Sequence, residues 1–152
     1  MALGLTTCTS KIYDAFLSED KLKTLFHGHS FTANPVSCSA ALASLDLLLK
    51  PETLSDISRI ADQHRQFAAR IAGHAKVRTI RQTGTILAIE WETGDNTCYF
   101  NTIRDDLYNF FLQQGIILRP LGNIIYIMAP YCITNDQLEY IYKKIEQALE
   151  QF

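Results

Sequence analysis

The sequence carries a polar loop whose residue types suit an anion. Residues 26–35 read Phe-His-Gly-His-Ser-Phe-Thr-Ala-Asn-Pro, and a run rich in alanine and leucine follows them. A loop of this kind directly before a helix offers hydroxyls and backbone N–H groups to a negatively charged group. A purely structural interpretation stays open at this point, in which Asn34 only caps the helix and the histidines lie on the surface.

Arg119 and Tyr126 are two further residues that could contact a ligand. Arg119 is a lone cation among apolar residues, and Pro120 stiffens the chain beside it. A guanidinium held in this way suits the capture of a carboxylate by two parallel hydrogen bonds. A surface arginine at a strand end is an equally simple interpretation. Tyr126 lies in an apolar run over 124–128, where its hydroxyl could reach a ligand, although half-buried strand tyrosines without a ligand are commoner.

Hydrolytic, metal-binding and nucleotide-binding motifs are absent from the sequence. It contains no G-x-S-x-G, H-E-x-x-H, G-x-x-x-x-G-K or G-x-G-x-x-G string. His27 and His29 lie two residues apart with no obvious ligand partner, so no metal site is predicted. The four cysteines form no C-x-x-C pair, which argues against zinc and disulfides and favours free thiols in a reducing cytoplasm.

The composition narrows the classes of partner. The 152 residues are 47% apolar and 20% charged, the mix of an ordinary soluble globular protein. The formal net charge is −2, with cations scattered among carboxylates, so neither nucleic acid nor an anionic membrane surface is expected as a partner. No apolar stretch is long enough to cross a bilayer, and no membrane association is predicted.

Helices and short strands must position these residues. A helix is predicted over 36–49, with Pro35 in its first turn; because it is apolar nearly all round, we expect it to be buried in a larger body or at a subunit contact. Residues 2–6 resemble a buried strand, and a chain that opens on such a strand is expected to lack something upstream. The order of elements from residue 51 onward predicts helices on one face of a small sheet. The other predicted elements are a helix over 11–17 capped by Ser10, helices over 51–73 and from Ile103 to Gly115, strands over 77–91 around a turn at Thr83–Gly84, a turn at 93–96, short β-rich segments at 116–118 and 123–128, and a last helix with a capping box of Thr134 and Gln137.

Two strings resemble segments of a known family. Residues 26–35, followed by a helix rich in cysteine and alanine, resemble the H-G-x-[ST]-[FY]-x-[GA]-N-P segment of class III aminotransferases. Residues 118–131, Leu-Arg-Pro-Leu-Gly-Asn-Ile-Ile-Tyr-Ile-Met-Ala-Pro-Tyr, resemble one branch of that family, the adenosylmethionine–8-amino-7-oxononanoate aminotransferases. The similarity covers essentially the whole chain.

The resemblance implies an α/β fold, that of a fold type I pyridoxal-phosphate-dependent transferase. Residues 1–50 would be the C-terminal tail of its large cofactor-binding domain, and residues 51–152 its small C-terminal α+β domain. The implied reaction moves an amino group from S-adenosylmethionine to 8-amino-7-oxononanoate and gives 7,8-diaminononanoate for biotin synthesis. A related class III enzyme that acts on ornithine, GABA or another ω-amino donor is the alternative activity.

The resemblance also gives each residue a role. Gly28, His29 and Ser30 match the loop that reaches the phosphate of pyridoxal phosphate bound in the partner subunit. This sequence has His29 where some members have proline and Ser30 where some have threonine. Either hydroxyl can donate to a phosphate oxygen, so the role of this position is kept. Arg119 matches the arginine that holds the substrate carboxylate, and Tyr126 matches a tyrosine of the substrate pocket.

The family's cofactor-binding lysine has no match in this sequence. The resemblance aligns that lysine a few residues before the first residues of the chain, and no lysine here has an equivalent context (Lys11, Lys21, Lys23, Lys50, Lys76, Lys143 and Lys144). No catalytic residue is therefore assigned, and we expect this fragment to be inactive alone. A homodimer, a split enzyme completed by a separate N-terminal half and a non-functional truncated product all stay open.

Overall fold

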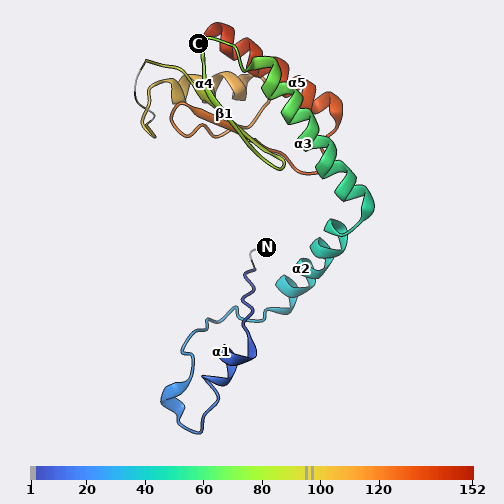
Figure 1. Cartoon of the computed structure of the whole chain (residues 1–152), viewed down its shortest axis with the longest axis vertical. Coiled ribbons are helices and arrows are strands. Elements are labelled where there is room, and N and C mark those ends of the chain that lie inside the picture. The colour runs from blue at the N-terminus through green and yellow to red at the C-terminus, as the bar shows by residue number, and fades with distance from the viewer. Residues whose placement is uncertain (1–2, 95, 97) are drawn as a thin grey trace. The chain divides into compact units, whose positions relative to one another are not determined.

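The computed structural model describes residues 3–94, 96 and 98–152, which fall into two compact units. The first unit is residues 1–50 and the second is residues 51–152. In Figure 1 the first unit is coloured from blue to cyan, and the second continues from green to red. The assignment of the first unit to a large cofactor-binding domain stays a prediction.

The first unit has no hydrophobic core among its described residues. It consists of helix α1 (Ser10–Asp14), the 3₁₀ helix η1 (Lys21–Lys23) and helix α2 (Pro35–Leu48). Ser37 is the only buried residue among those described in this unit. Leu42 and Leu49 are each 64% exposed, although α2 is apolar nearly all round. The predicted burial of this helix therefore requires protein from outside the unit.

Two predictions for the first unit are wrong. Residues 3–6 form no strand, and Ala2 lies outside the described residues. A strand needs a hydrogen-bonded neighbour, and the described part of this unit provides none. The first helix begins at Ser10 with Thr9 in the N-cap position, and it ends at Asp14 instead of Leu17. A helix this short is marginal without tertiary packing, and none of its residues is buried.

The second unit packs helices on one face of an antiparallel sheet, as the order of elements predicts. Helices α3 and α5 lie side by side across the sheet in Figure 1, and Arg70 of α3 forms ion pairs with Glu139 and Glu146 of α5. The strand order is β1-β2-β3, with both pairs antiparallel. The elements are α3 (Pro51–Ile71), β1 (Val77–Thr83), β2 (Ile86–Trp91), α4 (Ile103–Gln113), β3 (Ile124–Met128) and α5 (Asn135–Gln151).

The core lies between the sheet and these helices. Leu87, Ile89 and Trp91 alternate along β2 and are fully buried. They meet apolar residues of α3 and α5, among them Ile60 and Ile145, which are also fully buried. Burial of each such side chain contributes about 1.5–3 kcal/mol to the free energy of unfolding. The burial of this face of the sheet against the helices therefore fixes which way the sheet faces. The capping box of Thr134 and Gln137 at the start of α5 is confirmed.

One predicted β segment of the second unit is not a strand. Residues 116–118 alternate as a strand would, with Ile116 and Leu118 each 8% exposed and Ile117 85% exposed. They nevertheless pair with no strand among the described residues. The alternation in exposure therefore reflects packing against the core and not pairing with β3. The predicted turn at 93–96 contains Asp95, which lies outside the described residues.

A buried histidine joins α3, the β1–β2 turn and α5. His64 is fully buried, with Nδ1 at 2.7 Å from the Tyr142 hydroxyl and Nε2 at 3.1 Å from the Thr85 carbonyl oxygen. Because a carbonyl only accepts, we assign the proton of the neutral ring to Nε2, and Nδ1 accepts from Tyr142. Burial lowers the pKa of His64 from its usual 6.5, against a smaller opposing effect of the Thr85 hydrogen bond.

This lowered pKa predicts a loss of stability in mild acid. The unfolded chain takes up a proton near pH 6.5 while folded His64 stays neutral, so its contribution to the unfolding free energy is complete above about pH 6.5. That contribution decreases as the pH falls from there toward the lower pKa of the folded state. Urea unfolding of the chain and of His64→Gln should show a stability difference that narrows below about pH 6.5. Parallel pH profiles would contradict this assignment.

Candidate functional site

The loop predicted to bind a phosphate ends at the N-terminus of α2. Asn34 caps this 14-residue helix, because its Oδ1 accepts from the N–H groups of Val36 and Ser37 at 3.0 and 3.1 Å. Ala33 just before it has φ of 53°, a left-handed conformation that is rare outside glycine. The structural interpretation of Asn34 as a helix cap is therefore correct, and it does not exclude a ligand in the loop.

The three predicted cofactor residues lie together in this loop. The His29 amide donates to the Thr32 hydroxyl at 3.1 Å, and the Thr32 amide donates back to the His29 carbonyl at 2.9 Å. The His29 ring accepts from the Phe31 amide through Nδ1 at 3.1 Å. His29 therefore shapes the turn, while Ser30 is exposed at its tip.

The donors that this loop leaves available suit a phosphate. No hydrogen bond of the Ser30 hydroxyl is found within residues 3–94, 96 and 98–152. No atom lies within 4 Å of the position where Gly28 would carry a Cβ, so the backbone beside it is open to a ligand. A hydroxyl and exposed amides before a helix N-terminus are the donor set that phosphate oxygens accept from.

Of the two predicted substrate residues, Arg119 precedes β3 and Tyr126 is the middle residue of that strand. Arg119 is exposed between Leu118 and Pro120, both buried. No ion pair or hydrogen bond of its guanidinium is found in the part of the chain that the structure describes. After a turn the chain enters β3, where half-buried Tyr126 lies opposite Ala88 of β2. The structure thus presents Arg119 to solvent with its five N–H donors available for a carboxylate.

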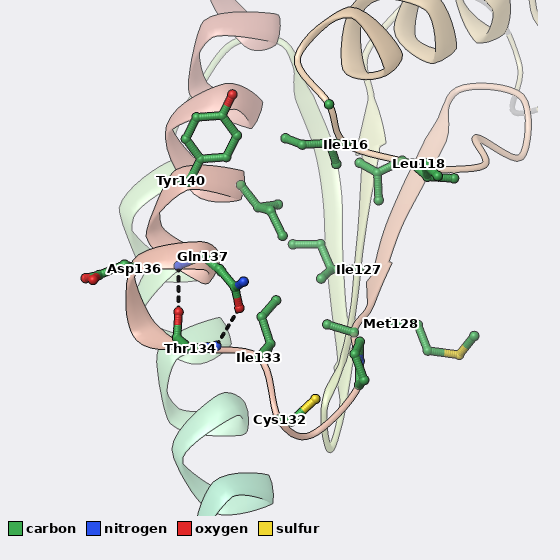
Figure 2. A pocket seen from close by; sticks show the side chains of 15 residues that line it. Ile116, Leu118, Ile127, Met128, Cys132, Ile133, Thr134, Asp136, Gln137 and Tyr140 are labelled. Atoms are coloured by element: carbon green, nitrogen blue, oxygen red, sulfur yellow. Dashed lines mark hydrogen bonds between the residues drawn. The ribbon is translucent and has the colours of Figure 1, made fainter.

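A groove of about 780 Å³ lies close to these two residues and was missed by sequence analysis. Figure 2 shows Ile116, Leu118, Ile127 and Ile133 around its apolar floor, with the first turn of α5 along one side. Arg119 and Tyr126 do not line it, so this groove is not the pocket that they were predicted to share.

Metal-ligating groups do not gather at any of these places. No group of three or more His, Cys, Asp or Glu residues suitable for a metal ion occurs among the described residues. The four cysteines are free, and three of them are exposed. None of the helices in the described ranges is both long and apolar enough to cross a membrane.

Comparison with known families shows which class of enzyme the chain belongs to. The family model for class III aminotransferases matches residues 1–149, so the chain belongs to this family of pyridoxal-phosphate-dependent enzymes. The predicted family and fold class are therefore confirmed. One relative, adenosylmethionine-8-amino-7-oxononanoate aminotransferase of Synechococcus elongatus, is 38% identical over 151 residues, which are 99% of this chain and 35% of the relative. The chain spans about a third of the length of this relative and of the relatives of the same name from Geobacter sulfurreducens and Methanocaldococcus jannaschii.

Solved structures give the same result. The crystal structure of adenosylmethionine-8-amino-7-oxononanoate aminotransferase from Methanocaldococcus jannaschii superposes with a TM-score of 0.84 at 29% identity. The match covers 94% of this chain and 34% of that one. An aminotransferase from Vibrio fluvialis, in its PMP-bound form, has a TM-score of 0.76 at 22% identity over 86% of this chain and 30% of that one, which shows the fold alone. The roles of Gly28, His29, Ser30, Arg119 and Tyr126 stay predictions.

Proposed function

We propose that this chain is the C-terminal part of an aminotransferase of biotin synthesis. The enzyme would transfer an amino group from S-adenosylmethionine to 8-amino-7-oxononanoate and release 7,8-diaminononanoate. The observation that carries this proposal is the 38% identity over 99% of the chain to a relative of that name. Residues 1–50 would complete the large cofactor-binding domain, and residues 51–152 would be the small domain.

The cofactor of the proposed reaction is pyridoxal phosphate. When bound, it supplies the carbonyl carbon that takes up the amino group and passes it on. The donors of this chain fit only its phosphate end: the Ser30 hydroxyl and the backbone around Gly28 and His29 would hold the phosphate oxygens. The loop would do so in a partner subunit, since the exposed apolar α2 beside it is suited to a subunit contact. We therefore propose a homodimer.

The substrate residues of the proposed enzyme would be Arg119 and Tyr126. The acceptor has an apolar chain with a carboxylate at the end remote from the reacting carbon. The exposed guanidinium of Arg119 can bind that carboxylate with two parallel hydrogen bonds and so set the direction of the chain. Tyr126, further along the same segment on β3, would contact the acceptor beside it.

The chain would require further protein for catalysis. None of its seven lysines lies in a context that matches the cofactor-binding lysine of the family. That lysine would come from the rest of the same polypeptide or from a separate subunit of a split enzyme. A cytoplasmic location is part of the proposal, because free thiols suit a reducing compartment.

Product formation by the chain alone and by an assembled enzyme tests this function directly. The chain alone, with pyridoxal phosphate and both substrates, should form no 7,8-diaminononanoate. An assembled enzyme, in which this chain replaces the matching 35% of the Synechococcus elongatus relative, should form it. The control is the same assembled enzyme with its cofactor-binding lysine changed to alanine. Product from the chain alone, or an assembled enzyme that accepts only other keto substrates, would contradict the proposal.

Ser30→Ala tests the phosphate loop in the assembled enzyme. Loss of one hydrogen bond to a charged phosphate costs about 1.5–3 kcal/mol, so the Kd for pyridoxal phosphate should rise roughly ten- to a hundredfold. Ser30→Thr is the matched control, because it keeps the hydroxyl and should keep the affinity. Spectrophotometric titration of the cofactor gives the Kd, and the KM of the acceptor should change much less. An unchanged Kd in Ser30→Ala would remove Ser30 from the site.

A further inference from the structure

A buried asparagine ties the segment that carries Arg119 to the central strand. Asn123 is fully buried, and its side-chain Nδ2 donates to the Trp91 carbonyl at 2.8 Å. The Trp91 amide donates to the Asn123 carbonyl, also at 2.8 Å. Because a carbonyl only accepts, the amide nitrogen of Asn123 must face Trp91. Both backbone groups of the last residue of β2 are thus bonded to this one asparagine.

The backbone on the Arg119 side of Asn123 is fixed as well. Gly122 has φ of 64°, and a Cβ there would lie 1.8 Å from the backbone oxygen of Cys98. Leu121 and Ile124 exchange two backbone hydrogen bonds of 2.8 and 3.2 Å across the turn. Pro120 is buried. The chain from 120 to 124 is therefore held by close packing and by hydrogen bonds, while the side chain of Arg119 remains exposed.

This arrangement bears on how well Arg119 can recognise a carboxylate. A guanidinium gains its advantage over an ammonium only when its planar fork meets both oxygens in the right direction. A displacement of about 1 Å at such a contact can cost about a hundredfold in rate. The backbone of Arg119 must therefore be fixed. Among the described residues, the side chain of Asn123 makes the one side-chain hydrogen bond that links this turn to the sheet.

We infer that Asn123 is a positioning residue for Arg119, through its hydrogen bond to the Trp91 carbonyl. The inference rests on the proposed function, in which Arg119 binds the carboxylate of the acceptor. Asn123 itself, being fully buried, does not touch the substrate. Its loss should impair recognition of the carboxylate and leave the remainder of the reaction intact.

The test compares the acceptor with its methyl ester in the assembled enzyme. Asn123→Ala, and Asn123→Asp, whose carboxylate cannot donate to the Trp91 carbonyl, should reduce the preference for the acid over the ester in kcat/KM by about tenfold. Tyr142→Phe is the matched control: it removes one buried hydrogen bond, to His64, in another part of the unit. It should lower stability and keep the acid preference.

Two outcomes distinguish this inference from the proposed function. If Arg119→Ala loses the acid preference while Asn123→Ala keeps it, Asn123 is merely structural and the inference is wrong. If Arg119→Ala also keeps the preference, the role of Arg119 is wrong and the inference is lost with it.

A second measurement uses the 152-residue chain itself. The Leu121 and Ile124 amides should exchange with deuterium about tenfold faster in Asn123→Ala than in Tyr142→Phe, because only the first loosens the turn. Equal exchange in the two variants would overturn the inference even if the assembled enzyme could not be obtained.

Discussion

Replacing Arg119 by alanine in the assembled enzyme is expected to raise the KM for 8-amino-7-oxononanoate by about two orders of magnitude. The physical reason is that a carboxylate left in the site without its cation costs several kcal/mol. Arg119 is exposed, and its guanidinium forms no hydrogen bond or ion pair within the described part of the chain. Its removal should therefore leave the fold intact, and cofactor binding should not change. Steady-state kinetics with the purified variant gives both quantities.

The controls separate the effect of the charge of Arg119 from the effect of its hydrogen-bond geometry and from a general effect of losing an arginine. The methyl ester of the acceptor has no carboxylate, so Arg119→Ala should change its KM little. Arg119→Lys should recover only part of the loss, because an ammonium lacks the planar fork. Arg81→Ala removes another exposed arginine, on β1, and should have no comparable effect. If the alanine variant loses as much on the ester as on the acid, Arg119 is structural and the proposed acceptor is wrong.

The elements that the sequence predicts well are those with a strong local signal. α3 and α5 each carry an apolar stripe at helical spacing, and α5 also has its capping box. The two wrong strands, at 2–6 and 116–118, were read from short apolar runs. Whether such a run joins a sheet depends on a hydrogen-bonding partner far away in the sequence, which a local pattern cannot supply.

The same contrast between local and long-range signals separates the residues that the sequence singled out from those that it did not. The loop over 26–35 and Arg119 were singled out because their residue types suit anions, and the resemblance to the family then selected Gly28, His29 and Ser30 within the loop. Asn123 gave no such signal, since its hydrogen-bond partner lies 32 positions away and its burial is visible only in the folded unit. The groove beside residues 116–118 was missed for the same reason, because two stretches of the chain, within 115–118 and 127–141, form it.

Gly122→Ala is expected to destabilise the second unit by more than about 3 kcal/mol, among the larger effects of a single substitution. A residue with a side chain costs roughly 1–2 kcal/mol in the left-handed region, and Gly122 has φ of 64°. A Cβ at this position would also lie 1.8 Å from the Cys98 oxygen and 3.2 Å from the Cα of Tyr99. Both are backbone atoms, so no side-chain rotation can relieve the collision, and two segments of chain must move apart.

Gly115→Ala is the control that isolates this collision. Gly115 has φ of 71°, and no atom lies within 4 Å of its Cβ position, so alanine there should cost only the roughly 1–2 kcal/mol of the backbone conformation. Trp91 is the only tryptophan of the sequence and is fully buried in this unit, so its fluorescence reports urea unfolding of both variants. If the two variants lose equal stability, the approach of Gly122 to Cys98 does not hold the turn. In that case hydrogen bonds hold the turn beside Arg119, those that Asn123 forms with Trp91 and those between Leu121 and Ile124. Asn123→Ala should then be the more damaging change for carboxylate recognition.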